Sequence, residues 1–291
     1  MIDALSAAST KRSLLRRAPR QLALFVAGVA LAAGAAIGET QTITVASTTS
    51  TQNSGLFEYL LPQFTADTGV EVRVVAVGTG QAIRIATNGD ADVLLVHHPA
   101  SERRFVADGF GLARHAVMHN DFVLVGPADD PAGVRGKSNI AAALRRIGEA
   151  EQVFVSRGDD SGTHKKELEL WGAAAFDPHP ASGAWYRESG SGMGATLNAA
   201  SAMAGHTLTD RASWVSFGNK GELEILVEGD TRLHNPYAAI VVNPERHPHV
   251  RASEAQTFVD WLTSVRGQAA IAAYRVHGQQ LFFPDAAAEE D

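Results

Sequence analysis

The hydrophobic pattern of the first half of the chain alternates between strand-like and helix-like spacing. Runs of β-branched and apolar residues predict strands at residues 42–47, 70–77 and 93–96. Apolar residues at helical spacing between positions 56 and 64 predict a helix that begins near Asn53 or Ser54, both good N-caps. Pro62 lies inside this helix and is expected to kink it or to lower its stability. Shorter helices are expected at residues 81–87 and 101–108.

The second half continues the alternation. We expect strands at residues 122–126, 153–156, 214–217 and 238–242. We expect helices at residues 139–150, 164–176, 192–204, 253–265 and 267–274. Strands that alternate with helices predict an α/β fold with largely parallel sheets.

The N-terminal segment, residues 1–38, has the pattern of an export signal. Five basic residues precede an apolar run at 22–36, and Ala36 and Gly38 are small residues at the positions that a signal peptidase reads. A membrane anchor is the alternative, but the run is shorter than the roughly 20 residues that a span requires. The sequence does not distinguish general secretory from twin-arginine export. A second terminal segment, residues 285–291, is expected to be a frayed acidic tail.

Composition limits the function classes. The 291 residues carry a net charge of −7, and removal of residues 1–38 leaves 20 basic and 31 acidic residues. This charge of −11 argues against nucleic acid or an anionic membrane as a partner. The chain has no cysteine, which excludes disulfides, thiol catalysis, zinc–thiolate sites and a lipid anchor on cysteine.

Loops rich in serine, threonine and glycine follow several predicted strands and precede helices. Four such loops lie at residues 47–50, 78–81, 156–163 and 189–194. A helix N-terminus offers unpaired backbone N–H groups and a partial positive charge, and glycine allows close approach of a ligand. Several of these ends together predict an anion site, even in an acidic protein. Arg157 is the one basic residue within the loops and provides planar donors for an oxyanion, or alternatively a structural ion pair with Asp159 or Asp160.

The sequence gives less support to a catalytic site or a metal site than to an anion site. Neither a dinucleotide fingerprint nor a phosphate-binding P-loop occurs. His97 and His98 are expected to point to opposite faces of a strand end, which makes a poor pair of metal ligands. Ser161 and His164 suggest a hydrolase, but no GxSxG motif accompanies them.

These motifs together resemble the periplasmic tungstate-binding proteins of bacterial ABC uptake systems. The matching segments are STTS (47–50), VGTGQA (77–82), GDADVLLVH (89–97), NDFVLVGP (120–127), SRGDDSGTHKKE (156–167), GSGMGATL (190–197) and LHNPYAAIVVNP (233–244). The resemblance spans roughly residues 42–284. Two positions depart from the family pattern: Ser47 stands where threonine is usual, and Ser191 where glutamine is frequent.

The resemblance implies a two-lobed periplasmic binding protein fold of type II with two chain crossings, near Asp121 and near Tyr237. Lobe 1 would comprise residues 39–121 and 238–284, and lobe 2 residues 122–237. It also implies a site between the lobes, with no catalytic residue and no metal cation. The implied ligand-binding residues are Thr48, Thr49, Ser50, Thr79, Gly80, Arg157, Ser161, Gly162, Thr163, Gly192, Met193 and Gly194.

The resemblance further implies a monomeric, non-enzymatic transport protein of the periplasm, without a cofactor and without membrane insertion after removal of the signal. Its partners would be an ABC permease and the ATPase of that permease. Tungstate is the expected ligand, and molybdate and phosphate stay open because size selection depends on geometry that a sequence does not show. An exported hydrolase that uses Ser161 and an extracytoplasmic sensor domain are the alternatives from other classes.

Overall fold

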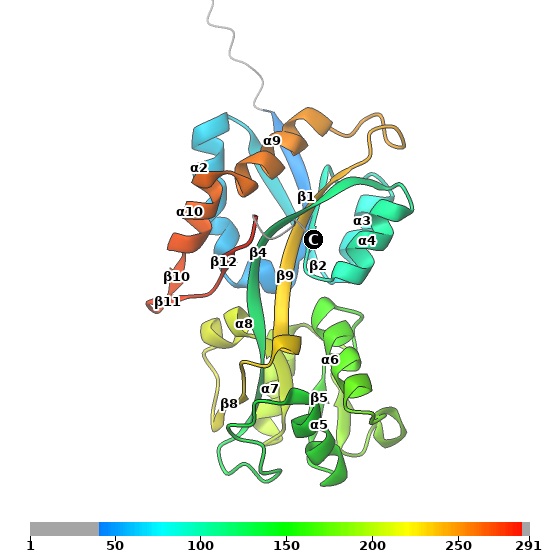
Figure 1. Ribbon diagram of the computed structural model, residues 1–291, viewed down its shortest axis with the longest axis vertical. Helices are drawn as coiled ribbons and strands as arrows, with labels where there is room; N and C mark the ends of the chain where they lie inside the picture. The colour runs from blue at the N-terminus through cyan, green and yellow to red at the C-terminus, as the bar shows by residue number, and fades with distance from the viewer. Residues whose placement is uncertain (1–40, 287–291) are drawn as a thin grey trace, which may run out of the picture. The chain divides into compact units, whose positions relative to one another are not determined.

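A computed structural model describes residues 41–286 of the chain. It is a mixed α/β fold whose main sheet has the strand order β12-β4-β9-β3-β1-β2, with β7 and β8 also paired to β4 (Figure 1). The expected α/β, two-lobed class is confirmed. The predicted export signal lies outside the described residues. Within residues 41–286, none of the helices has the length and apolar character needed to cross a bilayer.

The first lobe is built on three parallel strands, β1 (Thr42–Thr48), β2 (Glu71–Val77) and β3 (Val93–Val96). Its helices are α1 (Thr49–Asn53), α2 (Leu56–Thr68), α3 (Thr79–Thr87), α4 (Pro99–Ala107), α9 (Ala252–Thr263) and α10 (Val265–Ala273). A core that includes Phe64, Phe258 and Ile271 fills one side of this sheet, and a core around Leu94 and Phe105 fills the other.

The second lobe holds the helices α5 (Ile140–Glu149), α6 (Gly162–Ala173), α7 (Met193–Ala202) and α8 (Arg211–Ser216), and the 3-10 turn η1 (His179–Ala181). Its strands are β5 (Phe154–Ser156), β6 (Tyr186–Glu188), β7 (Thr207–Asp210) and β8 (Leu223–Val227). One core of this lobe contains a group of packed aromatic rings, in which Trp171, Phe154 and Tyr186 are almost fully buried.

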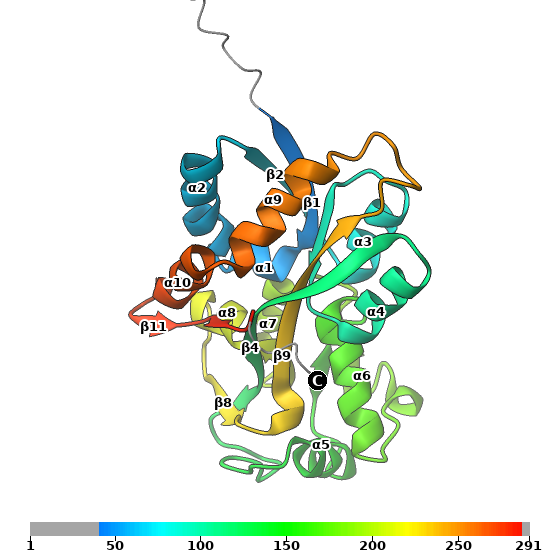
Figure 2. The ribbon, with the colours of Figure 1, turned by 45° about the horizontal axis from the view of Figure 1, so that its top comes forward.

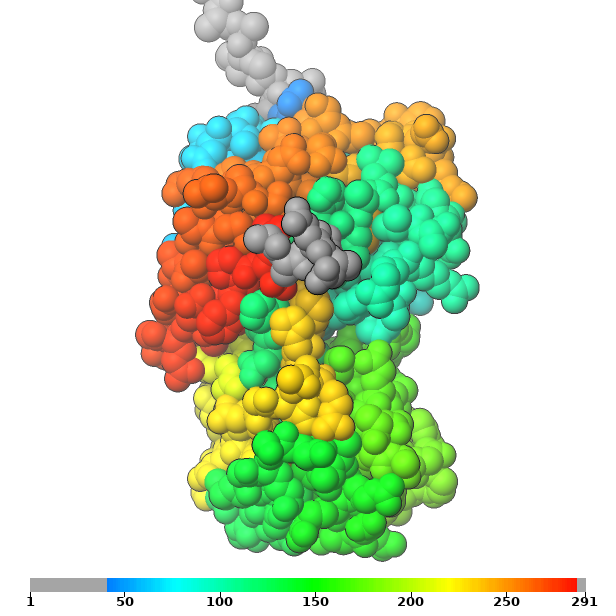
Figure 3. All heavy atoms as spheres, in the orientation of Figure 1, coloured from blue at the N-terminus to red at the C-terminus, as the bar shows by residue number. Residues whose placement is uncertain are grey.

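Two long strands connect the lobes. Strand β4 (Gly111–Pro127) pairs with β9 and β12 in its first part and with β7 and β8 in its last part. Strand β9 (His234–Val242) follows the 3-10 turn η2 (Thr231–Leu233) and runs antiparallel to β4, with Asp121 opposite His234 (Figures 1 and 2). The face shown in Figure 3 exposes both strands between the lobes. The lobe boundaries given above stay a prediction.

The last described residues pack against the first lobe. After the hairpin of β10 (Arg275–Val276) and β11 (Gln279–Gln280), strand β12 (Phe283–Pro284) pairs with β4 at His119 and Met118. Asp285 donates its backbone N–H to Val117 and to the Gln268 side chain. The beginning of the predicted acidic tail is therefore anchored, and residues 287–291 lie outside the described part.

Three sequence-based expectations were wrong. Residues 214–216 belong to helix α8 and Phe217 is its C-cap, so no strand forms there; Asp210 accepts from the Ser213 N–H as the N-cap of this helix. The hydroxyl-rich segment after β1 is the short helix α1, capped by Thr48, and the main helix α2 begins only after Gly55, which has φ of +80°. The sheets are largely parallel only in β1–β3 and β5–β6, since every pairing of β4 and β9 is antiparallel. The strand directions depend on partners that are distant in the chain, whereas α1 and α8 are short capped helices that the apolar pattern did not reveal.

Candidate functional site

The first predicted loop places a cluster of buried hydroxyls at the end of β1. The Thr48 hydroxyl lies 3.1 Å from the Ser50 hydroxyl and 2.8 Å from that of Thr51. Ser50 Oγ lies 3.5 Å from His97 Nε2, at the end of β3. The Ser47 hydroxyl, in contrast, donates to the Leu95 carbonyl, so its role is to hold two strands together. Thr49, at the first position of α1, is half-buried.

The second predicted loop (78–81) contacts the third (156–163), which lies in the other lobe. Thr79, at the start of α3, is fully buried and accepts a hydrogen bond of 2.9 Å from the Gly162 N–H at the start of α6. Next to it, a side chain on Gly80 would collide with the Asp160 carboxylate. The sequence therefore brings the N-termini of two helices from different lobes into direct contact.

Arg157 is the buried cation of the site. Its side chain is 4% exposed, its Nη2 donates to Asp159 Oδ2, and its Nε donates to the Ser191 carbonyl over 3.3 Å. The predicted alternative of an ion pair with Asp159 is therefore present. It does not remove the donor capacity of Arg157, because a guanidinium has five N–H groups and the described residues accept from only two of them.

Ser161 and Thr163 flank Gly162 and differ in what their hydroxyls do. Ser161 is the N-cap of α6, and its Oγ accepts from the His164 backbone N–H over 3.2 Å. Thr163 is 1% exposed, and its Oγ1 is buried without a hydrogen-bond partner among the described residues. Burial of a hydroxyl without a hydrogen-bond partner costs about 1–3 kcal/mol. The Thr163 hydroxyl can therefore donate a hydrogen bond to a ligand.

The fourth loop is less closely joined to the others. Gly192 caps α7 without a side chain, and both Gly192 and Gly194 are exposed. The Met193 side chain packs into the core with Val123, Val155 and Leu197. Only backbone N–H groups of this loop remain available to a ligand, and their contribution stays a prediction.

A buried polar network that the sequence analysis did not identify lies beneath the loops. His97 Nδ1 lies 2.9 Å from Asn235 Oδ1, and the His97 ring stacks on Tyr237 with centroids 4.8 Å apart. Burial lowers the pKa of His97 to about 4, so the imidazole is neutral near pH 7. Asn235 also donates to Asn120 Oδ1 over 2.6 Å. His97, Asn120 and Asn235 stand 23 to 138 positions apart, and no local pattern joins them.

Asp210 belongs to the same buried region. Its Oδ1 accepts from Ser213, while its Oδ2 is buried without a partner in the described part of the chain. Burial raises the pKa of Asp210, and the positive charge of Arg157 opposes this shift. Asp210 is therefore close enough to Arg157 for their charges to interact.

The geometry gives no support to a serine hydrolase. The Ser161 hydroxyl contacts the backbone of His164, and the His164 ring instead accepts from the Asp160 N–H through Nδ1. A serine nucleophile needs a base within hydrogen-bond reach of its hydroxyl.

Comparison with known proteins places the chain in a family. A model described as "PBP superfamily domain" matches residues 33–266. The tungstate-binding protein TupA of Peptoclostridium acidaminophilum is 48% identical over 249 residues, which cover 84% of this chain and 86% of that protein. The chain belongs to the tungstate-binding protein family of the PBP superfamily.

Two solved structures of tungstate proteins resemble this member of the family. The TupA of Desulfovibrio alaskensis G20 has a TM-score of 0.74 and 48% identity, over 84% of this chain and 99% of that chain. The protein described as the tungstate ABC transporter from Geobacter sulfurreducens has the same TM-score and 46% identity, over 80% and 98% of the two chains.

Proposed function

We propose that this protein is the tungstate-binding component of an ABC importer and that it captures the WO4 dianion between its lobes. The buried, unpartnered hydroxyl of Thr163 is the observation that carries the proposal. It lies in the first turn of α6, next to the Gly162–Thr79 contact between lobes. The names of the relatives support tungstate as the ligand.

The surrounding groups suit a dianion. The N-termini of α3 and α6 carry partial positive charge, and Arg157 adds a full charge while almost fully buried. Hydroxyls at Thr48, Ser50 and Thr163 add donors without further charge. We assign the ligand contacts to the residues predicted from the sequence, with only backbone contacts from Gly192, Met193 and Gly194.

The carboxylates near the loops favour an unprotonated ligand over phosphate. Phosphate near neutral pH keeps a proton, which a free carboxylate oxygen would accept. Asp159 already accepts from Arg157 and from the Ser161 N–H, and Asp160 pairs with Lys165. Asp210 Oδ2 is the remaining candidate acceptor near Arg157, so a substitution of Asp210 tests this preference.

The transport role follows from the family. We place the protein in the periplasm, delivered there by residues 1–38, and assign it a membrane permease with its ATPase as partners. We propose that it works as a monomer, without a cofactor and without catalysis, because its function is reversible capture. Ligand binding would stabilise the contact between lobes, since a ligand held by both lobes binds their closed arrangement best.

The test is calorimetric titration of the chain with tungstate, molybdate, sulfate and phosphate. We expect one tungstate per chain, weaker binding of molybdate, and no measurable heat with sulfate or phosphate. Tighter binding of phosphate than of tungstate would overturn the ligand assignment. An absence of heat with all four anions would refute the binding function itself.

A further inference from the structure

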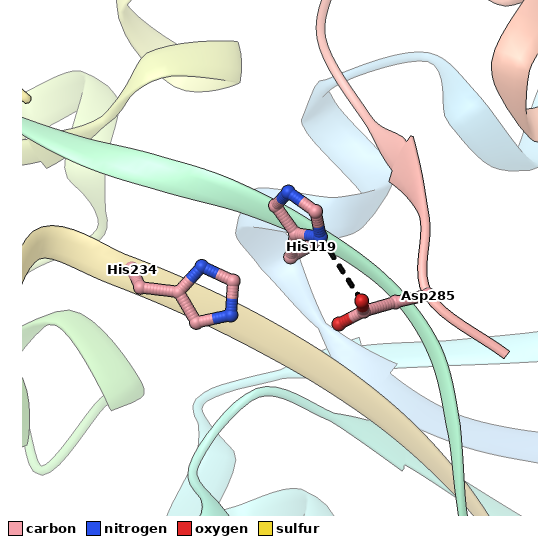
Figure 4. Close-up of side chains that lie close together, drawn as sticks. All are labelled: His119, His234 and Asp285. Carbon is pink, nitrogen blue, oxygen red and sulfur yellow. Dashed lines mark ion pairs between the residues drawn. The ribbon is translucent and has the colours of Figure 1, made fainter. Parts of the chain in front are cut away.

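Two histidines and an aspartate meet at the strands that connect the lobes. His119 lies on β4, His234 begins β9, and Asp285 directly follows β12 (Figure 4). One ligand atom from each side chain can be chosen so that all three atoms lie within 4.8 Å of one another. The site described above uses none of these residues. The three positions are separated by 115 and 51 residues, so no sequence motif reveals them.

The geometry of one pair already matches metal coordination. His119 Nδ1 lies 3.4 Å from Asp285 Oδ1. Two ligands at about 2.1 Å from a tetrahedral zinc ion are about 3.4 Å apart. His234 lies next to this pair, with its ring centroid 4.7 Å from that of His119. Its side chain is exposed, and one of its ring nitrogens lies within 4.8 Å of the ligand atoms of His119 and Asp285.

His119 Nδ1 is paired with the Asp285 carboxylate but lacks a hydrogen bond among the described residues. This ring nitrogen is buried. The ring cannot turn freely, because it stacks on Phe283 with centroids 5.5 Å apart. A buried ring nitrogen that has no hydrogen bond and lies beside a carboxylate is a candidate ligand for a metal ion.

The surroundings of Asp285 and His234 are also compatible with a bound cation. The Asp285 backbone is held by hydrogen bonds to Val117 and Gln268, which fix the carboxylate near β4. His234 lies beside a cavity of about 420 Å³ that also borders His119, Asp121 and Arg211. Arg211 is neutralised by Asp121 and Glu228, so its charge does not oppose a cation. The cavity leaves room for the water that completes a coordination shell.

We propose that His119, His234 and Asp285 bind one divalent transition-metal ion of the zinc class. Imidazole with a single carboxylate suits Zn²⁺, Ni²⁺ and Cu²⁺, whereas Ca²⁺ and Mg²⁺ take oxygen ligands almost exclusively. The ion would join the C-terminal segment to both strands that connect the lobes. It would therefore stabilise the folded chain, by an amount that rises with the logarithm of the free ion concentration once this concentration exceeds the Kd.

The test uses the full chain without a histidine tag, stripped with a chelator and free of tungstate. Zn²⁺ is titrated by calorimetry, and Co²⁺ reports coordination through its visible absorption. We expect one ion per chain and the intense bands of four-coordinate cobalt. Because tungstate is absent, the result does not depend on the proposed transport function.

Variants decide whether these residues are the ligands. His234→Gln and Asp285→Asn change side chains that are exposed or close to the chain end, and each should weaken Zn²⁺ binding more than tenfold. His179→Gln is the matched control, because His179 lies 2.7 Å from Asp177 in a surface pair elsewhere and should bind no ion alone. The proposal is overturned if the unaltered chain binds no Zn²⁺. It is also overturned if both ligand variants keep full affinity, or if the control loses it equally.

Discussion

The backbone N–H of Gly162 donates a hydrogen bond of 2.9 Å to Thr79 Oγ1 and so joins the first turns of two helices from different lobes. Both residues are buried, and the His97 ring also lies close to Gly162. The point where the lobes touch is therefore also the point where the proposed oxyanion donors gather. Substitutions at these two residues therefore test the contact between the lobes and ligand binding together.

Gly162→Ala should impair ligand binding strongly. The added Cβ would stand 2.8 Å from His97 Cε1 and 3.0 Å from Thr79 Oγ1. His97 cannot retreat, because it is held by Asn235 and stacks on Tyr237. We expect at least a tenfold loss of tungstate affinity in calorimetry.

Gly172→Ala is the control for this change. Gly172 lies in the same helix α6, and no atom lies within 4 Å of its added Cβ. Alanine in a helix interior is about 0.5–1 kcal/mol more favourable than glycine, so this variant should unfold at higher temperature and bind tungstate normally. Equal affinities of the two variants would show that the Gly162 contact is irrelevant to binding.

Arg157→Ala should weaken tungstate binding by about 2–5 kcal/mol, the usual cost of truncating one partner of a buried charged contact. Arg135→Ala is the comparison, because Arg135 also pairs with a carboxylate, Glu224, but its side chain is 43% exposed. That variant should bind like the unaltered chain. An unchanged affinity in Arg157→Ala would remove this residue from the site.

Thr163→Val separates binding from stability. The hydroxyl has no partner within the part of the chain that the structure describes, so its loss should leave the unfolding free energy unchanged or raise it slightly. Tungstate affinity should fall by about 1.5–3 kcal/mol, the value of a hydrogen bond to a charged group. Thr263→Val, which loses a hydroxyl bond to the Val259 carbonyl in α9, should do the reverse: lower stability and normal binding. Thermal unfolding and calorimetry measure the two effects.

Asp210→Asn distinguishes tungstate from a protonated ligand. Asparagine keeps the oxygen that caps Ser213 and removes a carboxylate whose pKa is raised by burial. Tungstate affinity should stay equal or rise by up to about tenfold, or 1.4 kcal/mol, because a negative charge near Arg157 is lost. A more than tenfold loss would indicate that Asp210 accepts a proton from the ligand, as a phosphate site requires.

Glu167→Gln should change how stability depends on pH. Burial raises the pKa of Glu167 from 4.5 to about 7, although Tyr186 donates a hydrogen bond of 2.7 Å to it. The folded chain then holds a proton that the unfolded chain has released, so this group lowers stability as pH rises from about 4.5 to about 7. The slope reaches about 1.4 kcal/mol per pH unit. Chemical denaturation at pH 5 and pH 8 should show a smaller decline in the variant, and an identical decline would contradict the assignment.

The sequence by itself determined the class of the fold and the loops of the site. Hydrophobic spacing placed β1, β2, β3 and α5 to within about two residues, because these elements follow local periodicity. Hydroxyls, glycines and Arg157 at helix starts predicted oxyanion binding, since the donors of a helix N-terminus are a local property. The motifs at 47–50 and 156–167 also indicated the family correctly.

Tertiary structure alone decided which groups meet. The pairing of β4 with strands of both lobes, the contact of Thr79 with Gly162, and the burial of Asp210 depend on segments far apart in the chain. The same holds for His119, His234 and Asp285, which three strands bring together. Local propensity carries no information on such contacts, because they form only when the strands pair and the lobes close.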